Sequence, residues 1–169
     1  MLLYSIPVNE KTAAYILSWR YPSPYDLYND TGEEESLKEF LENPYFAVIN
    51  EMDEIIGFYC IGYSAQVPNG YLFGVYEEGY LDIGLGMKPE LIGKGYGASF
   101  LAFILYLIEK KYGRVPLRLT VATFNERAIH LYEKFGFAKR MMFDDMITTF
   151  QTMVKEDDLK NIIEGTNSI

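Results

Sequence analysis

The chain has 169 residues, of which 49% are hydrophobic and 23% charged, a composition that suits one globular domain with a full apolar core. Acidic residues outnumber basic ones by 24 to 15, and the net charge of −9 argues against non-specific nucleic-acid binding. The longest apolar run, Ala98 to Ile108, is too short to cross a bilayer, which takes about 20 residues. The single cysteine, Cys60, cannot form an internal disulfide, and the first residues lack the basic segment and apolar core of a signal peptide. We therefore expect a single domain over residues 1–169 that is cytoplasmic and has no membrane or nucleic-acid partner.

The first third of the chain predicts a strand, two helices and a hairpin. Asn9 can cap the first helix, and the Pro-rich YPSP after Arg20 ends it. Two apolar runs rich in β-branched and aromatic residues, separated by the polar NEMDE, are typical of a hairpin. The predicted elements are strand 2–6, helix 10–19, helix 34–41, and strands 45–49 and 55–64.

The remainder of the chain predicts one strand–helix–strand crossover, then a helix and two strands. The long helix closes with two lysines and Gly113, and Asn125 can cap the next helix. The apolar face of that helix is expected to be Ala128, Leu131, Tyr132 and Phe135. The predicted elements are strand 80–88, helix 97–112, strand 117–123, a helix ending at Gly136, strands 137–143 and 147–154, and a tail after Lys155 that is a short helix or frayed. The order indicates an α/β domain with a mostly antiparallel front half.

Three glycines alternate in Gly93-Lys94-Gly95-Tyr96-Gly97, directly before the long helix. The amides of such a loop can converge with the unpaired N–H groups of the first helical turn, which suits a phosphate or pyrophosphate. Glycine allows close approach and unusual backbone angles, and Lys94 adds a mobile cation. A P-loop is excluded because no lysine in that frame precedes Ser or Thr. A dinucleotide fingerprint is excluded because Gly84-Leu85-Gly86 runs into Met87, Lys88 and Pro89.

The segment NERAIHLYEKFGF, from Asn125 to Phe137, follows the glycines by about thirty residues. Together the two pieces resemble the GNAT superfamily of N-acetyltransferases, best from Leu81 to Phe137. The family motif of Gln or Arg, two residues, Gly, one residue, then Gly or Ala maps onto Ile92 to Gly97. Ile92 departs from it and removes a polar side chain from the pyrophosphate site.

The resemblance implies an α/β single-domain GNAT fold, with a mixed, mostly antiparallel sheet of six to seven strands and four helices. It also implies direct transfer of an acetyl group from acetyl-CoA to a primary amine in a ternary complex. Leu85 and Met87 would offer backbone groups to the pantetheine arm, and an N–H near Met87 would face the thioester oxygen. The pyrophosphate site implied by the motif consists of Ile92, Gly93, Lys94, Gly95, Tyr96, Gly97 and Ala98.

Three further residues take roles from the resemblance. Tyr132 would give a proton to the departing CoA thiolate, although a core residue of its helix is the alternative. Asn125 would cap its helix, contact the cofactor, or do both. Asp82 would act as the base, because the branch of the family that acetylates ribosomal-protein N-termini often carries Glu there. Glu77 and Glu78 are alternatives, and each carboxylate could also be a solvated edge residue.

We expect no catalytic or metal-binding role for the remaining candidate residues. His130 lies on the polar side of its helix, Cys60 is expected in the core, and no spacing matches a metal site. Aromatic residues gather in segments 20–28 and 70–76, where they pack in the core or wall a small-molecule pocket. Two rival hypotheses stay open: a non-catalytic acyl-CoA-binding or sensor module, and an interaction domain. The acceptor amine is not identified, and a homodimer through the last strands would fit the family.

Overall fold

A computed structural model describes residues 1–156, and they divide into two compact units. The first unit comprises Met1–Ala65 and Ile83–Leu105, and the second comprises Gln66–Asp82 and the described chain from Tyr106 onward. The predicted tail after Lys155 lies outside the described residues, except for Glu156.

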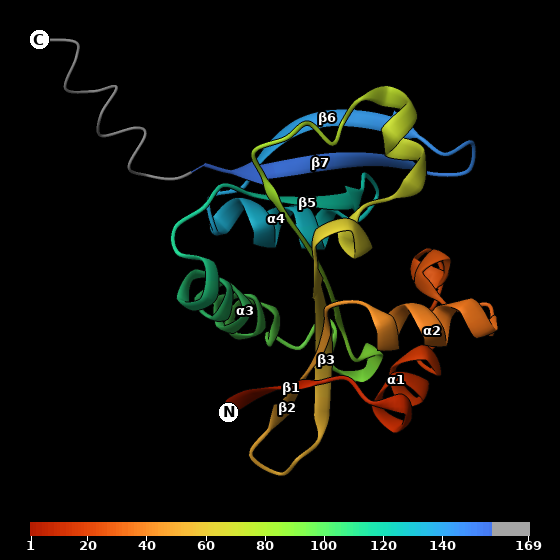
Figure 1. Ribbon diagram of the computed structural model, residues 1–169, viewed down its shortest axis with the longest axis vertical. Coiled ribbons are helices and arrows are strands. Elements are labelled where there is room, and N and C mark those ends of the chain that lie inside the picture. The colour runs from red at the N-terminus through yellow and green to blue at the C-terminus, as the bar shows by residue number, and fades with distance from the viewer. Residues whose placement is uncertain (157–169) are drawn as a thin grey trace, which may run out of the picture. The chain divides into compact units, whose positions relative to one another are not determined.

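The first unit is built on antiparallel strands that carry two helices on one face (Figure 1). Ile16, Trp19 and Ala47 form the buried cluster beneath these helices, and the rings of Phe40 and Phe58 pack against it. The unit contains β1 (Leu3–Pro7), α1 (Glu10–Leu17), α2 (Glu34–Glu42), β2 (Tyr45–Asn50), β3 (Ile55–Ile61) and most of β4 (Leu81–Met87).

The opposite face of β3 is covered by the start of α3 (Gly97–Tyr112). A Cβ atom on Gly57 would collide with the ring of Phe100, so glycine lets this helix approach the strand closely. Phe100, Leu101 and Ile104 are almost completely buried. The apolar run that is too short for a bilayer therefore forms a core helix, as the sequence predicts.

In the second unit, β7 lies between β5 and β6, with α4 on one side of these strands and the 3-10 helix η3 on the other (Figure 1). Phe143 and Phe150 stack at 5.6 Å between ring centroids, in a buried cluster with Val75 and Ala122. The β6–β7 register shifts between Lys139 and Met142. The elements are η3 (Pro68–Phe73), β5 (Leu117–Ala122), α4 (Glu126–Lys134), β6 (Ala138–Asp144) and β7 (Thr149–Lys155).

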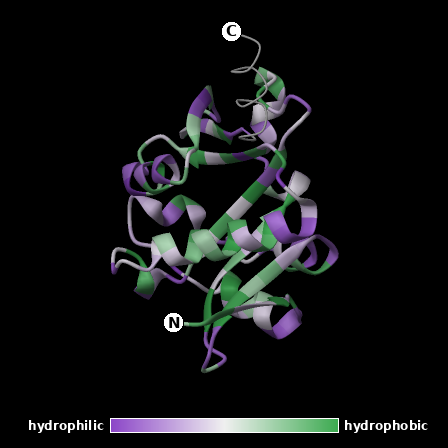
Figure 2. Cartoon of the chain, turned by 90° about the vertical axis from the view of Figure 1, so that its left-hand side faces the viewer, coloured by the Kyte–Doolittle hydropathy of each residue, from purple (hydrophilic) through white to green (hydrophobic). Residues whose placement is uncertain are grey.

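The full strand order is β1-β2-β3-β4-β5-β7-β6, a seven-stranded mixed sheet. Among the strands of residues 1–156, only β4 and β5 run parallel, and their pairing is confined to Leu81 with Leu117 and Asp82 with Arg118. The predicted α/β class, the mostly antiparallel sheet and the single crossover are confirmed, as are four α-helices in the described chain. Figure 2 shows hydrophobic residues concentrated along the strands. No helix within residues 1–156 is long and apolar enough to span a membrane.

Some boundaries and faces differ from the prediction. The third strand ends at Ile61, because Gly62 takes a positive φ of 81° and starts a 3-10 turn. On α4 the buried residues are Ile129 and Tyr132, whereas Ala128, Leu131 and Phe135 are only half-buried. The 3-10 helices were not predicted: η1 (Tyr25–Tyr28), η2 (Gly62–Ala65), η3, and η4 (Pro89–Leu91).

Candidate active site

The glycine loop of the first unit has the backbone geometry that a phosphate cradle requires. Gly93 and Gly95 have φ values of 74° and 85°, in the left-handed region that favours glycine. Phe100 is the residue whose N–H reaches back to the Tyr96 carbonyl, at 3.1 Å, so the first-turn amides before it have no partner within the helix. Gly93, Lys94, Gly95 and Ala98 are exposed, and Ile92, Tyr96 and Gly97 are half-buried.

One edge of β4 in the first unit has no strand partner among the described residues. The Lys88 N–H donates to the Ile56 carbonyl on β3 at 2.8 Å. Because backbone groups alternate along an antiparallel strand, those of Gly84 and Gly86 also point to β3, and those of Leu85 and Met87 point away from it. The two residues predicted to meet the pantetheine arm therefore present their N–H and C=O groups at the open edge.

The glycines of β4 serve packing. A Cβ on Gly86 would collide with the ring of Phe58, its register partner on β3, and one on Gly84 would lie 2.8 Å from the Cys60 Sγ. Both glycines therefore allow close contact between two strands, in agreement with the rejection of a dinucleotide motif here.

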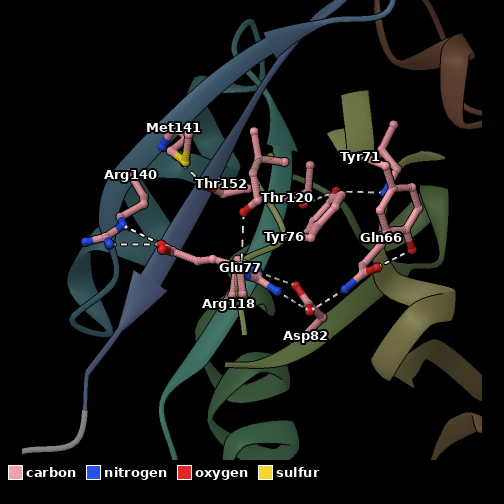
Figure 3. Close-up of polar contacts among 12 residues, drawn as sticks. Gln66, Tyr71, Tyr76, Glu77, Asp82, Arg118, Thr120, Arg140, Met141 and Thr152 are labelled. Carbon is pink, nitrogen blue, oxygen red and sulfur yellow. Dashed lines mark hydrogen bonds and ion pairs between the residues drawn. The ribbon is translucent and has the colours of Figure 1, made fainter. Parts of the chain in front are cut away.

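Asp82, predicted as the base, lies in a buried ion pair in the second unit (Figure 3). The Arg118 Nε donates to Oδ1 at 2.7 Å and its Nη2 donates to Oδ2 at 2.7 Å, so the pair is bidentate. Gln66 Nε2 also donates to Oδ2, at 2.8 Å. The two charged side chains are 3% and 5% exposed, which means that the carboxylate is held by its neighbours and not by solvent.

Arg118 is enclosed on its remaining sides. Its guanidinium lies 5.1 Å from the ring centroid of Tyr76 and 5.2 Å from that of Tyr80, within the range of cation–π attraction. Its Nη1 also donates to the Glu77 carbonyl at 2.8 Å. Burial disfavours the charged form of Arg118, but the bonds to Asp82 outweigh it and raise the pKa of the guanidinium. Sequence reasoning missed Arg118 and Gln66 as partners of Asp82.

The two alternative carboxylates differ in their surroundings. Glu77 Oε1 accepts from Arg140 Nε at 3.1 Å and from Nη2 at 2.9 Å, an ion pair that is nearly half exposed (Figure 3). Glu78, the next residue, is exposed. The three candidate bases are therefore a buried ion-paired carboxylate, a surface ion-paired carboxylate and an exposed one.

Tyr132 lies on α4 in the second unit, and Asn125 is the residue that precedes this helix. Tyr132 is buried, 9% exposed, and its ring meets that of Phe137 edge to face at 6.1 Å. The Asn125 side-chain oxygen accepts from the Ala128 N–H at 3.3 Å, so the predicted capping role is confirmed. These contacts fix where α4 begins and on which side of it Tyr132 lies.

His130 and Cys60 lie where the sequence predicts. His130 is exposed, and Cys60 is buried on β3. Burial raises the pKa of the Cys60 thiol to about 12, so it stays protonated and unreactive near neutral pH. Within the described part of the chain, no cluster of His, Cys, Asp and Glu could hold a metal ion.

Residues 13–137 match the model of the Acetyltransferase (GNAT) family. The match covers well over half of the sequence, and the chain belongs to this family. No curated protein matches the chain.

Solved structures share the fold at low sequence identity. The aminoglycoside acetyltransferase AAC(6')-Ib in complex with coenzyme A has a TM-score of 0.70 at 18% identity, over 99% of this chain and 100% of that one. A GNAT-family acetyltransferase from Bacillus anthracis has a TM-score of 0.68 at 16% identity, over 92% and 95%. A chimera of the Vibrio cholerae spermidine N-acetyltransferase SpeG and hSSAT has a TM-score of 0.66 at 18% identity, over 95% and 98%. At such identities the likeness shows the fold alone.

Proposed function

We propose that this protein transfers the acetyl group of acetyl-CoA directly to a primary amine. The observation that carries the proposal is the left-handed pair Gly93 and Gly95 directly before α3, in a chain that belongs to the GNAT family. A neighbour of the same fold is a complex with coenzyme A, which supports acetyl-CoA as the co-substrate.

In this proposal the amides of Gly93 to Ala98 bind the pyrophosphate, and Lys94 adds a cation near it. Leu85 and Met87 bond the pantetheine arm along the open edge of β4, as an added strand would. The Met87 N–H meets the thioester oxygen as negative charge develops on it. Asn125 contributes a cofactor contact beside its capping bond. Ile92 supplies no polar group, so the backbone amides supply most of the pyrophosphate affinity.

The acceptor must reach the thioester carbon as a neutral amine. An amine with a pKa of ~10.4 is neutral in only about one molecule in 2,500 at pH 7, which corresponds to about 4.6 kcal/mol. The amine nitrogen attacks the carbonyl carbon, its proton passes to a base, and the C–S bond breaks as Tyr132 gives its phenolic proton to the CoA sulfur. Tyr132 is our proposed acid.

Asp82 remains the base that the sequence predicts, with Glu77 and Glu78 as alternatives. The oxygens of Asp82 already accept three hydrogen bonds from Arg118 and Gln66, so fewer of its lone pairs can face an amine or a water. Glu78 is exposed and free of that constraint. A comparison of Asp82→Asn, Glu77→Gln and Glu78→Gln assigns the role: the base is the residue whose loss lowers kcat and flattens its rise with pH.

A second candidate function is a non-catalytic acyl-CoA-binding module, which the apolar Ile92 in the cofactor motif favours. It predicts binding of acetyl-CoA with no acetylated product. The amine panel must include polyamines, aminoglycosides and peptide N-termini, because two neighbours act on the first two classes by name.

Thermal unfolding with and without acetyl-CoA tests the proposal, with ATP and NAD as controls. A ligand at 100 times its dissociation constant adds about 2.7 kcal/mol, enough to raise the midpoint by several degrees. We expect a rise with acetyl-CoA alone, followed by product in the amine panel. No rise with acetyl-CoA would contradict both candidate functions and favour an interaction domain.

A further inference from the structure

The connection between β3 and β4 is much longer than their pairing requires. The two strands are antiparallel neighbours, which a loop of about two to five residues can join, yet the chain from Gly62 to Tyr80 separates them. Connections longer than about 12 to 15 residues usually carry a function. This one carries η3, which lies in the second unit beside β6 and the end of the β6–β7 hairpin (Figure 1, yellow-green).

The inner side of η3 is fixed to the second unit by its neighbours. The Val67 N–H donates to the Tyr76 hydroxyl at 2.7 Å, and this hydroxyl shares a further hydrogen bond with Thr120 Oγ1 at 2.9 Å (Figure 3). The ring of Phe73 packs on that of Phe143, next to the hairpin turn, at 6.3 Å between centroids. Because η3 is held in one place, its outer side chains are presented in a fixed arrangement.

The outer side of η3 and the turn of the β6–β7 hairpin expose five large apolar side chains. Leu72 on η3 is 84% exposed, and Met146 and Ile147 in the turn are 98% and 93% exposed. Tyr71 and Phe73 are about half exposed. Side chains of this size have surfaces of roughly 150–250 Å² each, so the five leave on the order of 700 Å² in solvent. The largest apolar patch of a monomeric protein is typically about 300–600 Å², so these five residues, the η3–hairpin face, have the extent of an interaction surface.

The charge distribution indicates what can cover this face. Residues 66–76 contain no charged side chain, in a chain whose net charge is −9. In the turn, the side chains of Asp144 and Asp145 accept hydrogen bonds from Thr149 and from the backbone of the turn itself. Neither segment contains a basic residue that would attract nucleic acid or an anionic surface. Two copies of so acidic a chain repel each other over most of their surface, so they can associate only where carboxylates are scarce, as they are on η3.

We propose that the η3–hairpin face is covered by the same face of a second copy, related by a two-fold axis, so that η3 of each copy packs on the hairpin turn of the other. The ~700 Å² that each copy contributes is close to the ~800 Å² per partner of a standard interface. Turn against turn would instead bring Asp144 and Asp145 of one copy against those of the other, which is unfavourable. This inference goes beyond the proposed function and does not depend on acetyl transfer.

Sedimentation equilibrium of the full chain over micromolar concentrations tests the inference. We expect a species with twice the 19.5 kDa mass of one chain, which dissociates on dilution. Leu72→Lys and Ile147→Glu should each weaken the dimer roughly 100-fold, because a two-fold interface contains each change twice. Met52→Glu, at a side chain 70% exposed in the β2–β3 turn of the first unit, is the matched control and should leave the dissociation constant unchanged.

An equimolar mixture of Leu72→Lys and Ile147→Glu is the decisive measurement. In the mixed dimer, one contact between η3 and the turn keeps both apolar side chains, and the other brings opposite charges together. The mixture should therefore associate more tightly than either variant alone. A mixture that associates no more tightly overturns the pairing of η3 with the turn. A wild-type chain that stays monomeric, or a dimer that neither substitution weakens, overturns the inference and leaves the face to a different partner.

Discussion

Tyr132 is buried on α4, a placement that suits either a core ring or an acid held in one orientation. The two roles differ in what the hydroxyl does, so removal of that oxygen alone distinguishes them. If Tyr132 protonates the leaving thiolate, Tyr132→Phe should lower kcat on the order of 100-fold, at the lower end for general acids, and leave the KM for acetyl-CoA nearly unchanged.

The decrease in kcat of Tyr132→Phe should also depend on pH in a defined direction. CoA leaves as a thiolate that needs no proton once the pH exceeds its pKa of ~8.5, so the deficit of Tyr132→Phe should shrink above that pH. Steady-state rates from pH 6.5 to 9.5 measure it, with Tyr106→Phe, on a side chain 59% exposed, as the control. Full turnover by Tyr132→Phe at pH 7 would assign the residue to the core.

The raised pKa of the buried Cys60 thiol predicts that the protein becomes less stable at alkaline pH. A thiol with a pKa of about 12 in the fold and ~8.5 when unfolded stabilises the protein fully below pH 8.5, and that contribution disappears as the pH rises toward 12. The free energy of unfolding should therefore fall over this range, and it should fall less steeply in Cys60→Ala. Equal slopes would show that the thiol is not shielded; iodoacetamide should label it only in denaturant.

Residue roles were predictable where a local pattern defines them. Asn125 precedes a helix and caps it, and Gly93 and Gly95 stand where the backbone takes left-handed angles that favour glycine. The burial of Arg118 was not predictable, because an arginine inside the strand LRLTVA is ordinarily expected to point into solvent. Its burial depends on a carboxylate 36 residues earlier and on two tyrosine rings, none of which a local window contains.

At the level of elements, the two ends of α3 allow a controlled test of whether the glycine loop before the helix binds the pyrophosphate. Gly95 before the helix and Gly113 after it both have positive φ, 85° and 75°, and an added Cβ would touch nothing at either one. Alanine should cost about 1 kcal/mol of stability at each position through backbone strain alone. Only Gly95→Ala should also weaken CoA binding, by roughly tenfold, because it disturbs the amides that meet the pyrophosphate.

Urea unfolding and CoA titration of both variants measure these effects. Equal CoA affinity in Gly95→Ala and Gly113→Ala would remove the glycine loop from the cofactor site.

The elements themselves were largely predictable, because their hydrophobic periods and caps are local. Strand order was not. The sequence predicts two strands after α4 but does not say which of them pairs with β5. The two strands can form a hairpin with each other whichever of them lies beside β5. The structure places β7 in the middle, where Gln151 and Thr152 are buried although polar residues are typical of exposed strand positions.

At the level of the whole chain, Asp82 is the last residue of the second unit before β4 continues in the first. Its ion pair with Arg118 coincides with one of the two register positions at which β4 and β5 pair. Removal of one partner leaves a buried charge uncompensated, so Asp82→Asn and Arg118→Met should each lower the free energy of unfolding by about 3 kcal/mol or more. The double variant should lose much less than the sum of the two.

Equilibrium unfolding in urea, followed by fluorescence and by circular dichroism, measures this cycle and shows whether both units unfold together. Additive losses would mean that the two side chains do not stabilise one another. The same Asp82→Asn protein, assayed below its unfolding midpoint, then separates a loss of base from a loss of fold.

The position of β6 has a consequence for self-association. As the last strand in the order, β6 is the edge at which another sheet could add, and the register shift between Lys139 and Met142 breaks its run of evenly spaced backbone groups. A second copy that extended the sheet here would meet a kinked edge that carries a lysine, a pattern that protects natural sheets from uncontrolled stacking. If the protein dimerises, we therefore expect the two copies to meet through side chains, not through a continuous backbone ladder, and the interface to tolerate a proline on β6.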